Sequence, residues 1–512
     1  MKRVLGIISG ICAFFIIYLL PLDPATFPPA ARAVAAVTVL MVIWWLTEAI
    51  PIPATALVPL VAFPLLGILS PAEAAAPYAD KIIFLFMGGF IIAMSMQRWG
   101  LHRRIALTII RVMGTSPRRL IFGFMVATAF LSMWISNTAT AMMMVPIAIA
   151  IIATILPEHT VHLDQMTREQ RDFAECIVIS IAHAATIGGI ATIIGTPPNG
   201  IFIAEMEALF PAAPSIDFFT WMKFGVPLTA IFLPLAWFWL TRGPYRGMPK
   251  SISGGREVID DELAALGPMG RGERWTLLVF SLTAAAWIFA HTKVIAGVTV
   301  PGLDIIFPGI HDSTIAIFGA LLLFLLPVNL REGVFTMNWE WARKIPWGIL
   351  ILFGGGICLS VAFLESGLAE VIVDNLTIFH ALPIVVLVLI LGIGISLITE
   401  VTSNTAMAAV MMPVMAVTAV SIGIHPYFLM LTAAISTSLA FMLPVATPPN
   451  AVAYGSGYIT IRDMIRGGWV LNFMGIFLWT LFLFTLVTWV LGITPEMPAW
   501  AAGFALPSQG GY

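Results

Sequence analysis

Long apolar stretches follow one another along almost the whole chain and are separated by short polar connections. Many of these stretches reach about 20 residues, the length of a helix that crosses the hydrocarbon core of a bilayer. Several are longer and contain Gly or Pro, for example at Pro51 and Pro53, and such residues interrupt helices. The pattern therefore predicts an all-α polytopic membrane protein with discontinuous helices and re-entrant helical hairpins.

One long polar segment divides this pattern near its middle. Residues 242–274 are rich in Gly, Pro and charges of both signs, including six Lys or Arg residues, and this composition is typical of a linker. We therefore expect an N-terminal half (1–241), a cytoplasmic linker (242–274) and a C-terminal half (275–512).

The first residues resemble a signal peptide, because Lys2 and Arg3 precede an apolar run that ends at Leu20. The residues that follow, 21–24, are Pro-Leu-Asp-Pro and do not form a small-residue cleavage site. The segment therefore predicts an uncleaved first helix whose basic end lies in the cytoplasm.

Composition supports the membrane class and excludes others. Hydrophobic residues make up 60% of the chain and charged residues 10%, whereas soluble domains are about 25% charged. A net charge of −2 gives no indication of a nucleic-acid partner, and Cys12, Cys176 and Cys358 do not have the spacing of metal ligands.

Two polar motifs occur twice inside apolar stretches. In residue number, the triplet Ser-Asn-Thr is found at 136–138 and again at 403–405, an offset of 267, and the motif Thr-Pro-Pro-Asn is found at 196–199 and 447–450, an offset of 251. The difference between the two offsets fits a longer loop within 157–172 of the first half. A single polar triplet in a transmembrane helix is more often packing, but repetition in register predicts a duplicated site.

Other landmarks share the offset of the triplets. Gly88-Gly89 corresponds to Gly355-Gly356, and Ser132 corresponds to Thr399. We expect these glycine pairs to allow close packing or hairpin turns, within hairpins at 82–112 and 345–372.

Charge differs between the two equivalent segments that follow these hairpins. Residues 98–119 contain six Arg, whereas residues 365–386 contain no Lys or Arg and three acidic residues. The positive-inside rule assigns the first segment to the cytoplasm and the second to the outside. The halves are therefore predicted to be inverted-topology repeats, with both triplets near the middle of the membrane.

The repeated motifs contain residues that begin helices. Ser, Asn and Thr accept hydrogen bonds from free backbone N–H groups at helix N-termini, and Pro fits the first helical turn. A helix that starts inside the membrane presents a partial positive charge, which attracts anions. Four such breaks, two per repeat, are predicted to surround one small anion.

Lys and Arg are missing from the sequence close to these motifs, which favours an anion held by neutral donors, helix ends and bound cations. Glu400 is compatible with a coupling-ion ligand or with a buried, hydrogen-bonded structural carboxylate. We interpret Glu48 and His183 as structural residues. A nucleophile, metal cluster or carboxylate pair is not visible at the motifs, so the chain is not expected to be an enzyme.

These residues are similar to those of the divalent anion/sodium symporter family, which carries dicarboxylates, citrate and sulfate. Both triplets, both TPPN motifs and the run 437–450 carry the resemblance, which covers nearly the whole chain. It implies a homodimer with a scaffold part and a transport part in each protomer. It also implies elevator motion, in which the transport part, including the two hairpins, carries substrate and ions across the membrane.

The resemblance further implies Na⁺ as the coupling ion and assigns residues to two ion sites and one substrate site. The first ion site would use Ser132, Ser136, Asn137 and Gly195, and the second Thr399, Thr402, Asn404 and Ala446. Substrate carboxylates would contact Ser136, Asn137, Thr138, Thr196, Ser403, Asn404, Thr405, Thr447 and Pro448.

We therefore expect sodium-coupled symport of a C4-dicarboxylate such as succinate, fumarate or malate. The expected location is the plasma membrane, as a multi-pass protein of a bacterial inner membrane. Two alternatives from the same family remain open: a sodium-independent exchanger of di- or tricarboxylates, and a sodium/sulfate symporter.

Overall fold

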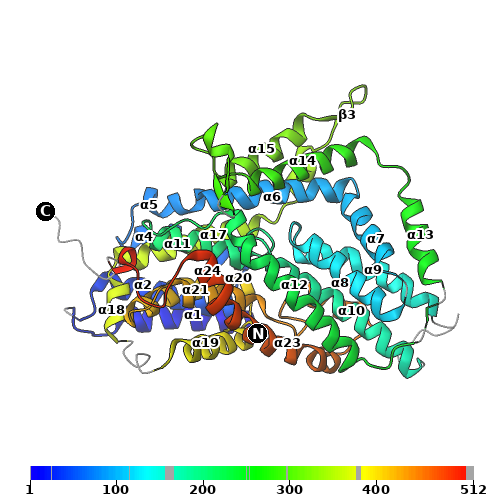
Figure 1. The fold of residues 1–512 in the computed structure, drawn as a ribbon. Helices are drawn as coiled ribbons and strands as arrows, with labels where there is room; N and C mark the ends of the chain where they lie inside the picture. The colour runs from blue at the N-terminus through cyan, green and yellow to red at the C-terminus, as the bar shows by residue number, and fades with distance from the viewer. Residues whose placement is uncertain are drawn as a thin grey trace.

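The computed structural model is helical apart from two short β-hairpins within the residues that it describes (Figure 1). Eight of the described helical segments are long and apolar enough to cross a membrane, as the sequence predicts for an all-α membrane protein. Most of the loop expected within 157–172 lies outside the described residues, and helix begins again at Arg168. The described residues are 2–24, 26–114, 116–155, 166–249, 251–252, 254–295, 298–375 and 382–502.

The first half forms twelve described α-helices. In chain order they are α1 (Lys2–Leu19), α2 (Pro29–Thr47), α3 (Ile52–Thr55), α4 (Val58–Leu65), α5 (Pro71–Ala75), α6 (Lys81–Arg98), α7 (Leu101–Met113), α8 (Pro117–Ser132), α9 (Asn137–Ile155), α10 (Arg168–Gly189), α11 (Pro197–Leu209) and α12 (Phe218–Arg242). A 3₁₀ segment, η1 (Ala76–Ala79), joins α5 to α6.

The linker and the second half contain the remaining elements. The helices are α13 (Gly255–Ala265), α14 (Arg271–Ile288), α15 (Asp312–Leu325), α16 (Trp339–Ala342), α17 (Trp347–Glu365), α18 (Leu368–Asn375), α19 (Ile384–Thr399), α20 (Asn404–Ser421), α21 (Tyr427–Ser438), α22 (Pro448–Gly455), α23 (Ile461–Phe482), α24 (Thr488–Leu491) and α25 (Ala499–Ala502). The hairpins pair β1 (Lys293–Ile295) with β2 (Val298–Val300) and β3 (Pro327–Asn329) with β4 (Val334–Phe335), both antiparallel. The short segments η3 (Leu303–Ile305) and η5 (Leu483–Val487) complete the half.

The helices of the two halves follow the same order around the repeated motifs. The first triplet separates α8 from α9, and the second separates α19 from α20. One TPPN motif begins α11 and the other begins α22. Gly100 before α7 and Gly367 before α18, which are related by the same offset as the triplets, both have φ of +72°. This order is the one that duplicated halves predict.

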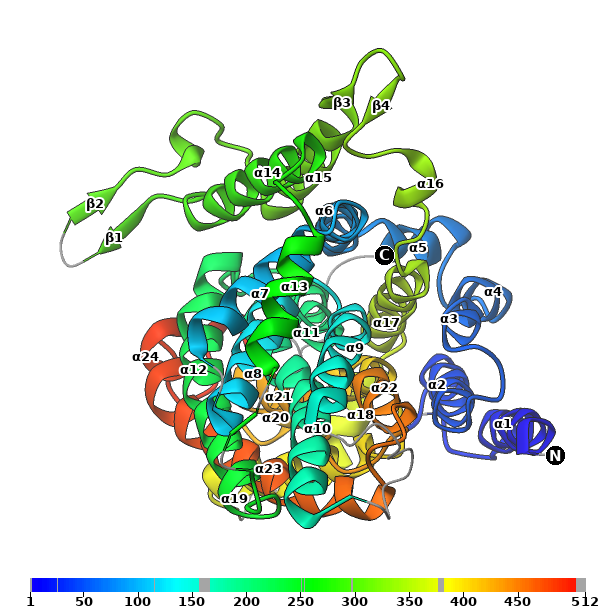
Figure 2. The same ribbon diagram turned by 90° about the vertical axis from the view of Figure 1, so that its right-hand side faces the viewer.

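The hairpins expected at 82–112 and 345–372 are wrong in position. In the first range α6 and α7 meet at Gly100, and α7 turns away to pack along α8 instead of returning along α6 (Figures 1 and 2). A left-handed glycine redirects the chain here. The second range bends in the same way at Gly367 between α17 and α18. The helix pairs that meet at the triplets are α8–α9 and α19–α20.

The paired glycines do allow close packing, as expected. A Cβ added at Gly88 would lie 2.5 Å from the backbone carbon of Ala316 on α15, and one at Gly355 would lie 2.5 Å from the carbonyl oxygen of Ala56. These distances leave no room for a side chain, so glycine sets how closely α6 approaches α15 and α17 approaches α3.

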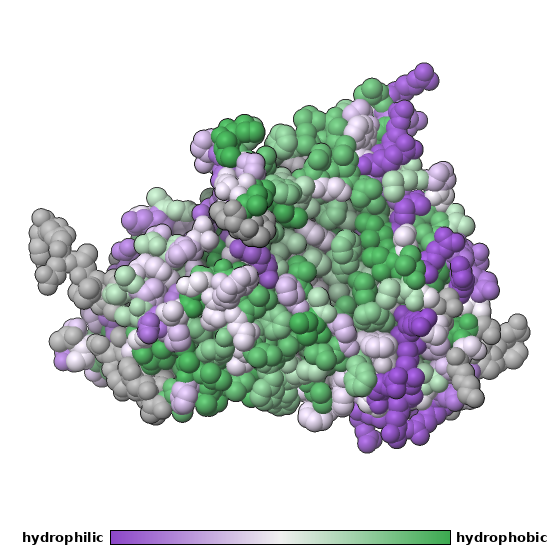
Figure 3. Space-filling view, in the orientation of Figure 1, coloured by the Kyte–Doolittle hydropathy of each residue, from purple (hydrophilic) through white to green (hydrophobic). Residues whose placement is uncertain are grey.

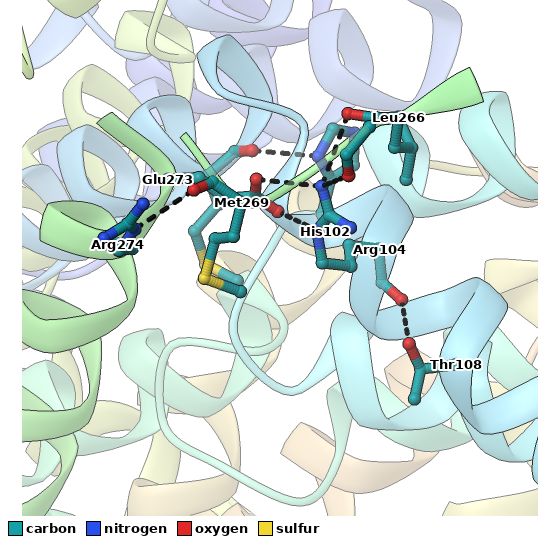
Figure 4. Close-up of polar contacts among 9 residues, drawn as sticks. His102, Arg104, Thr108, Leu266, Met269, Glu273 and Arg274 are labelled. Carbon is teal, nitrogen blue, oxygen red and sulfur yellow. Dashed lines mark hydrogen bonds and ion pairs between the residues drawn. The ribbon is translucent and has the colours of Figure 1, made fainter. Parts of the chain in front are cut away.

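The predicted linker contains a helix, α13, that lies against α7. Arg103 and Arg104 form ion pairs with Glu262 and Glu273, and Arg111 lies 2.8 Å from Asp260. Figure 4 shows the Arg104 guanidinium between the Glu273 carboxylate and the backbone of 266–267, where it donates to the carbonyl oxygen of residue 267 at 3.0 Å. These three arginines of α7 are therefore paired with acidic residues of α13 and of the start of α14.

Apolar side chains cover most of the face shown in Figure 3. Hydrophilic residues gather at the end of the molecule that carries α13 and the start of α10. On α15, Phe318, Leu321 and Leu325 are each more than half exposed. Exposed apolar side chains of this kind are expected where lipid chains replace water as the solvent.

A substitution at Gly188 tests the close approach of α10 to α8. A Cβ at this position would lie 2.3 Å from the carbonyl oxygen of Ala129, so Gly188→Ala is expected to destabilise the protein by about 1–3 kcal/mol. At Gly394 on α19 no atom lies within 4 Å of an added Cβ, so Gly394→Ala should stabilise by about 0.5–1 kcal/mol or change nothing. Thermal unfolding in detergent would show the difference; equal midpoints for the two variants would contradict the close approach.

Candidate functional site

Each Ser-Asn-Thr triplet lies at a turn where one helix ends and another begins. Asn137 and Asn404 are the first residues of α9 and α20. The hydroxyl groups of Ser136 and Ser403 each accept a hydrogen bond, 3.4 Å long, from the backbone N–H three residues later. The serines therefore cap the two helices, as the sequence predicts.

A hydroxyl group five residues before each triplet asparagine contacts its side chain. The hydroxyl of Ser132 contacts the side-chain amide of Asn137 and donates to the carbonyl oxygen of Ala185 at 2.7 Å. In the second repeat, the Thr399 hydroxyl lies 2.7 Å from Oδ1 of Asn404 and 3.2 Å from a carbonyl oxygen of α21. Both hydroxyl-bearing residues are fully buried. The structure thus reproduces the pairing of Ser132 with Thr399.

The first triplet also approaches the break between α10 and α11. With the amide nitrogen of Asn137 turned inward, it lies 3.2 Å from the carbonyl oxygens of both Ala185 and Gly195. Ser132, Asn137 and Gly195, three residues assigned to one Na⁺ site by resemblance, therefore come together. The oxygen atoms that meet here belong to hydroxyl and backbone carbonyl groups, which are ligands that hard cations prefer.

The two TPPN asparagines hold the unwound segments in shape. The side-chain amide of Asn199 donates to the carbonyl oxygens of residues 189 and 192, at 3.1 and 2.8 Å. That of Asn450 donates to residues 440 and 443, at 3.3 and 3.0 Å. The two pairs of acceptors are related by the same offset as the motifs themselves. This role was not predicted from the sequence, although an Asn directly after two prolines in an apolar stretch was the available signal.

Glu400 is a structural carboxylate, one of the two interpretations left open by the sequence. Its oxygens accept hydrogen bonds from the backbone N–H groups of Phe441, Met442 and Leu443, at 2.7, 3.0 and 2.9 Å. The side-chain amide of Asn472 adds a fourth, at 2.8 Å. Glu400 therefore satisfies three donors that the break after α21 leaves free.

His183 connects the two repeats. Its ring, fully buried on α10, places Nε2 at 3.0 Å from the carbonyl oxygen of Phe441 in the unwound segment of the second repeat. This contact agrees with the structural role expected for the histidine.

One cavity of about 1050 Å³ joins both triplets and both TPPN motifs. Four helices, α9, α11, α20 and α22, begin at its wall, and their N-termini present positive ends of backbone dipoles. All nine residues expected to contact substrate line it: Ser136, Asn137, Thr138, Thr196, Ser403, Asn404, Thr405, Thr447 and Pro448. Of the residues assigned to Na⁺, Gly195, Thr402 and Ala446 also line the cavity, while Ser132 and Thr399 lie buried behind its wall.

Other helices also contribute to the cavity lining. Glu48, at the end of α2, Phe90 of α6 and Ile349 of α17 all face it. The lining residues include no Lys or Arg, and Glu48 is the single charged residue among them. Glu48 is also the only described non-glycine residue with a positive φ, of 47°, at the C-cap of α2.

Comparison with known proteins identifies relatives over the full site. Residues 1–493 match a family model described as the sodium:sulfate symporter transmembrane region. A sodium-dependent dicarboxylate transporter, SdcS, of Staphylococcus saprophyticus is 39% identical over 502 residues, covering 97% of this chain and 93% of the relative. The protein of the same name from Staphylococcus aureus (strain MRSA252) is 38% identical over 497 residues, with the same coverage.

A solved structure also resembles the fold. It is the crystal structure of the Alcanivorax borkumensis YdaH transporter. The matched region covers 85% of this chain and 89% of the YdaH chain, with a TM-score of 0.54 and 14% sequence identity. This likeness concerns the fold alone. The family model and the relatives cover almost the whole chain, and we conclude that the protein is a membrane transporter that belongs to the divalent anion/sodium symporter family.

Proposed function

We propose that the protein is a secondary active transporter that couples the entry of a C4-dicarboxylate, such as succinate, fumarate or malate, to Na⁺. The observation that carries this proposal is that both triplets and both TPPN motifs line one cavity whose lining residues include no Lys or Arg. The names of the SdcS relatives support both the dicarboxylate and the sodium dependence.

The dianion would lie between the two triplets, with one carboxylate near each repeat. The hydroxyl and amide groups of 136–138 and 403–405 would donate to its oxygens, together with Thr196, Thr447 and the backbone around Pro448. The N-termini of α9, α11, α20 and α22 would add partial positive charge without the desolvation penalty of a buried Lys or Arg. A binding site of this kind requires cations beside the anion.

Two Na⁺ sites would flank the anion, one in each repeat. The first would use Ser132, Ser136, Asn137 and the carbonyl of Gly195, and the second Thr399, Asn404 and the carbonyls of Thr402 and Ala446. Moving a dianion inward against about 100 mV costs roughly 4.6 kcal/mol, at about 2.3 kcal/mol per charge. Two Na⁺ would cancel this cost, and a third would make entry electrically favourable.

Transport would proceed by an elevator motion. The transport part would be α8–α12 and α19–α23, which carry the four motifs, so the helix pairs at the triplets replace the segments 82–112 and 345–372 that were expected to move. The scaffold part would be α1–α6 and α14–α17, which supply Glu48, Phe90 and Ile349 to the cavity wall. Sliding of the first part along the second would carry the cavity across the membrane. We further propose a homodimer in a bacterial plasma membrane, with the N-terminus in the cytoplasm.

A second candidate function is sodium/sulfate symport. The description of the matching family model, which names sulfate, favours it. A sodium-independent exchanger of di- or tricarboxylates would avoid the electrical cost by moving one anion against another. The sulfate symporter differs from the first proposal because sulfate would compete strongly for the site. The exchanger differs because its transport would not depend on Na⁺.

Uptake of labelled succinate into proteoliposomes tests the proposed coupling. We expect accumulation with an inward Na⁺ gradient and none with an equal K⁺ gradient, because the anion site has no fixed cation of its own. Excess sulfate should compete weakly. Uptake that ignores Na⁺ but requires internal dicarboxylate would support the exchanger instead, and strong inhibition by sulfate would support the sulfate symporter.

The triplet asparagines give a mutational test. Asn137→Ala and Asn404→Ala should each reduce uptake to background, by at least about tenfold, because each removes a hydrogen-bonding group worth about 1.5–3 kcal/mol to a charged partner. Asn338→Ala is the matched control, since that asparagine caps α16 away from the cavity and accepts from the N–H of Trp341 at 3.1 Å. Full uptake by both triplet variants, measured on folded protein, would remove the site assignment.

A further inference from the structure

A carboxyl group outside the cavity is buried without an ionic partner among the described residues. Glu205 lies on α11, is 0% exposed, and neither of its carboxyl oxygens has a hydrogen-bond partner among the described residues. Its neighbour Glu207, two residues later, is partly exposed and forms an ion pair of 3.1 Å with Lys81. The two carboxyl groups therefore have very different surroundings, and the transport chemistry described above uses neither of them.

Glu205 lies where α11 packs against α17 and α20. A Cβ added at Gly356 on α17 would lie 3.2 Å from Oε1 of Glu205 and 3.2 Å from the Cβ of Ala409 on α20. Glycine at position 356 therefore leaves the space that the carboxyl group occupies. One turn later on α17, the buried hydroxyl of Ser360 faces the Glu205 carboxyl group and is its one hydrogen-bonding neighbour among the described side chains, although the two groups do not form a hydrogen bond of regular geometry.

Among the described residues, the titratable groups near Glu205 do not supply a positive charge. Asp80, before α6, acts on the Glu205 carboxyl group electrostatically, and Glu205 in turn acts on the thiol of Cys358 on α17. From the remaining neighbouring elements, Lys81 of α6 is bound to Glu207, and Tyr427 of α21 donates its hydroxyl to the carbonyl oxygen of residue 214. The helix α20 has no titratable side chain.

An ionised carboxylate in these surroundings would be unstable. Burial of an unpaired charge costs several kcal/mol and is avoided by neutralisation. A protonated carboxyl group has one O–H donor and can also accept a hydrogen bond. The Ser360 hydroxyl can likewise donate to the carboxyl group or accept from it. The packing of α11 on α17 is therefore compatible with a neutral Glu205 and not with a charged one.

We propose that Glu205 is a proton-binding site, occupied in the conformation described here and emptied when α11 moves away from α17. The O–H bond then breaks, water accepts the proton, and the carboxylate remains on the transport part. This inference rests on the proposed function, because it assigns α11 to the moving part and α17 to the scaffold. A proton would thus favour one end of the transport cycle, independently of the Na⁺ sites.

The pH dependence of transport follows from this assignment. Because the proton is bound in the described conformation, a rise in pH disfavours that conformation and slows the cycle. Fumarate is the suitable substrate, because both of its carboxyl groups stay ionised from about pH 6 to about pH 9. Wild-type Na⁺-driven uptake should fall by at least about threefold over this range. Glu205→Gln, a neutral side chain of the same shape, should change much less.

Glu207→Gln is the matched control, since it removes a partly exposed carboxylate two residues away. We expect its pH profile to follow the wild type. A Glu205→Gln variant that keeps the wild-type profile, or a wild type without any pH dependence, would overturn the proton site.

A second measurement does not depend on transport. Infrared spectra of the purified protein should contain a protonated-carboxyl band that is lost in Glu205→Gln and shifted in Ser360→Ala. If Glu205→Gln does not fold, the Ser360→Ala variant still tests the assignment. A spectrum in which neither variant changes such a band would overturn the proposal. Absence of uptake by the wild type, with the band present, would instead contradict the proposed transport function alone.

Discussion

The need to satisfy backbone N–H and C=O groups where helices break inside the membrane determines the arrangement of this protein. Hydrocarbon offers no hydrogen bonds, so irregular backbone persists only when protein groups or a polar cavity bind it. Here Asn199 and Asn450 each bind two carbonyl groups of an unwound segment. Glu400 binds three N–H groups of the second segment, and His183 binds one of its carbonyls from the other repeat.

The two repeats reach the same geometry with different supporting residues. The second break depends on Glu400, whose position in the first repeat is taken by Met133. There the hydroxyl of Thr192 donates to the carbonyl oxygen of Met133 at 2.6 Å and holds the unwound segment against α8. The support is a carboxyl group on one side and a neutral hydroxyl group on the other, so the two halves of the cavity differ in their electrostatic surroundings.

Much of this arrangement could be predicted from the sequence, because the strongest signals are local and repeated. The Ser403 cap, the pairing of Ser132 with Thr399 and the shared cavity follow from motifs in register. The hairpin positions could not be predicted, since whether Gly100 reverses or only bends the chain depends on tertiary packing of α7 against α8. The linker helix α13 was not predicted, because the residues of α7 that it contacts are far away in the sequence. The burial of Glu205 could not be predicted from hydrophobic periodicity, because it depends on the space that Gly356 of another helix leaves for the carboxyl group.

A cryo-electron microscopy map of the protein with Na⁺ and succinate would show whether both repeats bind one anion. We expect density for one dicarboxylate between residues 136–138 and 403–405, with a cation beside Asn137 and another beside Asn404. Dicarboxylate density that contacts only one triplet, or that lies outside the cavity next to Lys or Arg side chains, would contradict this expectation.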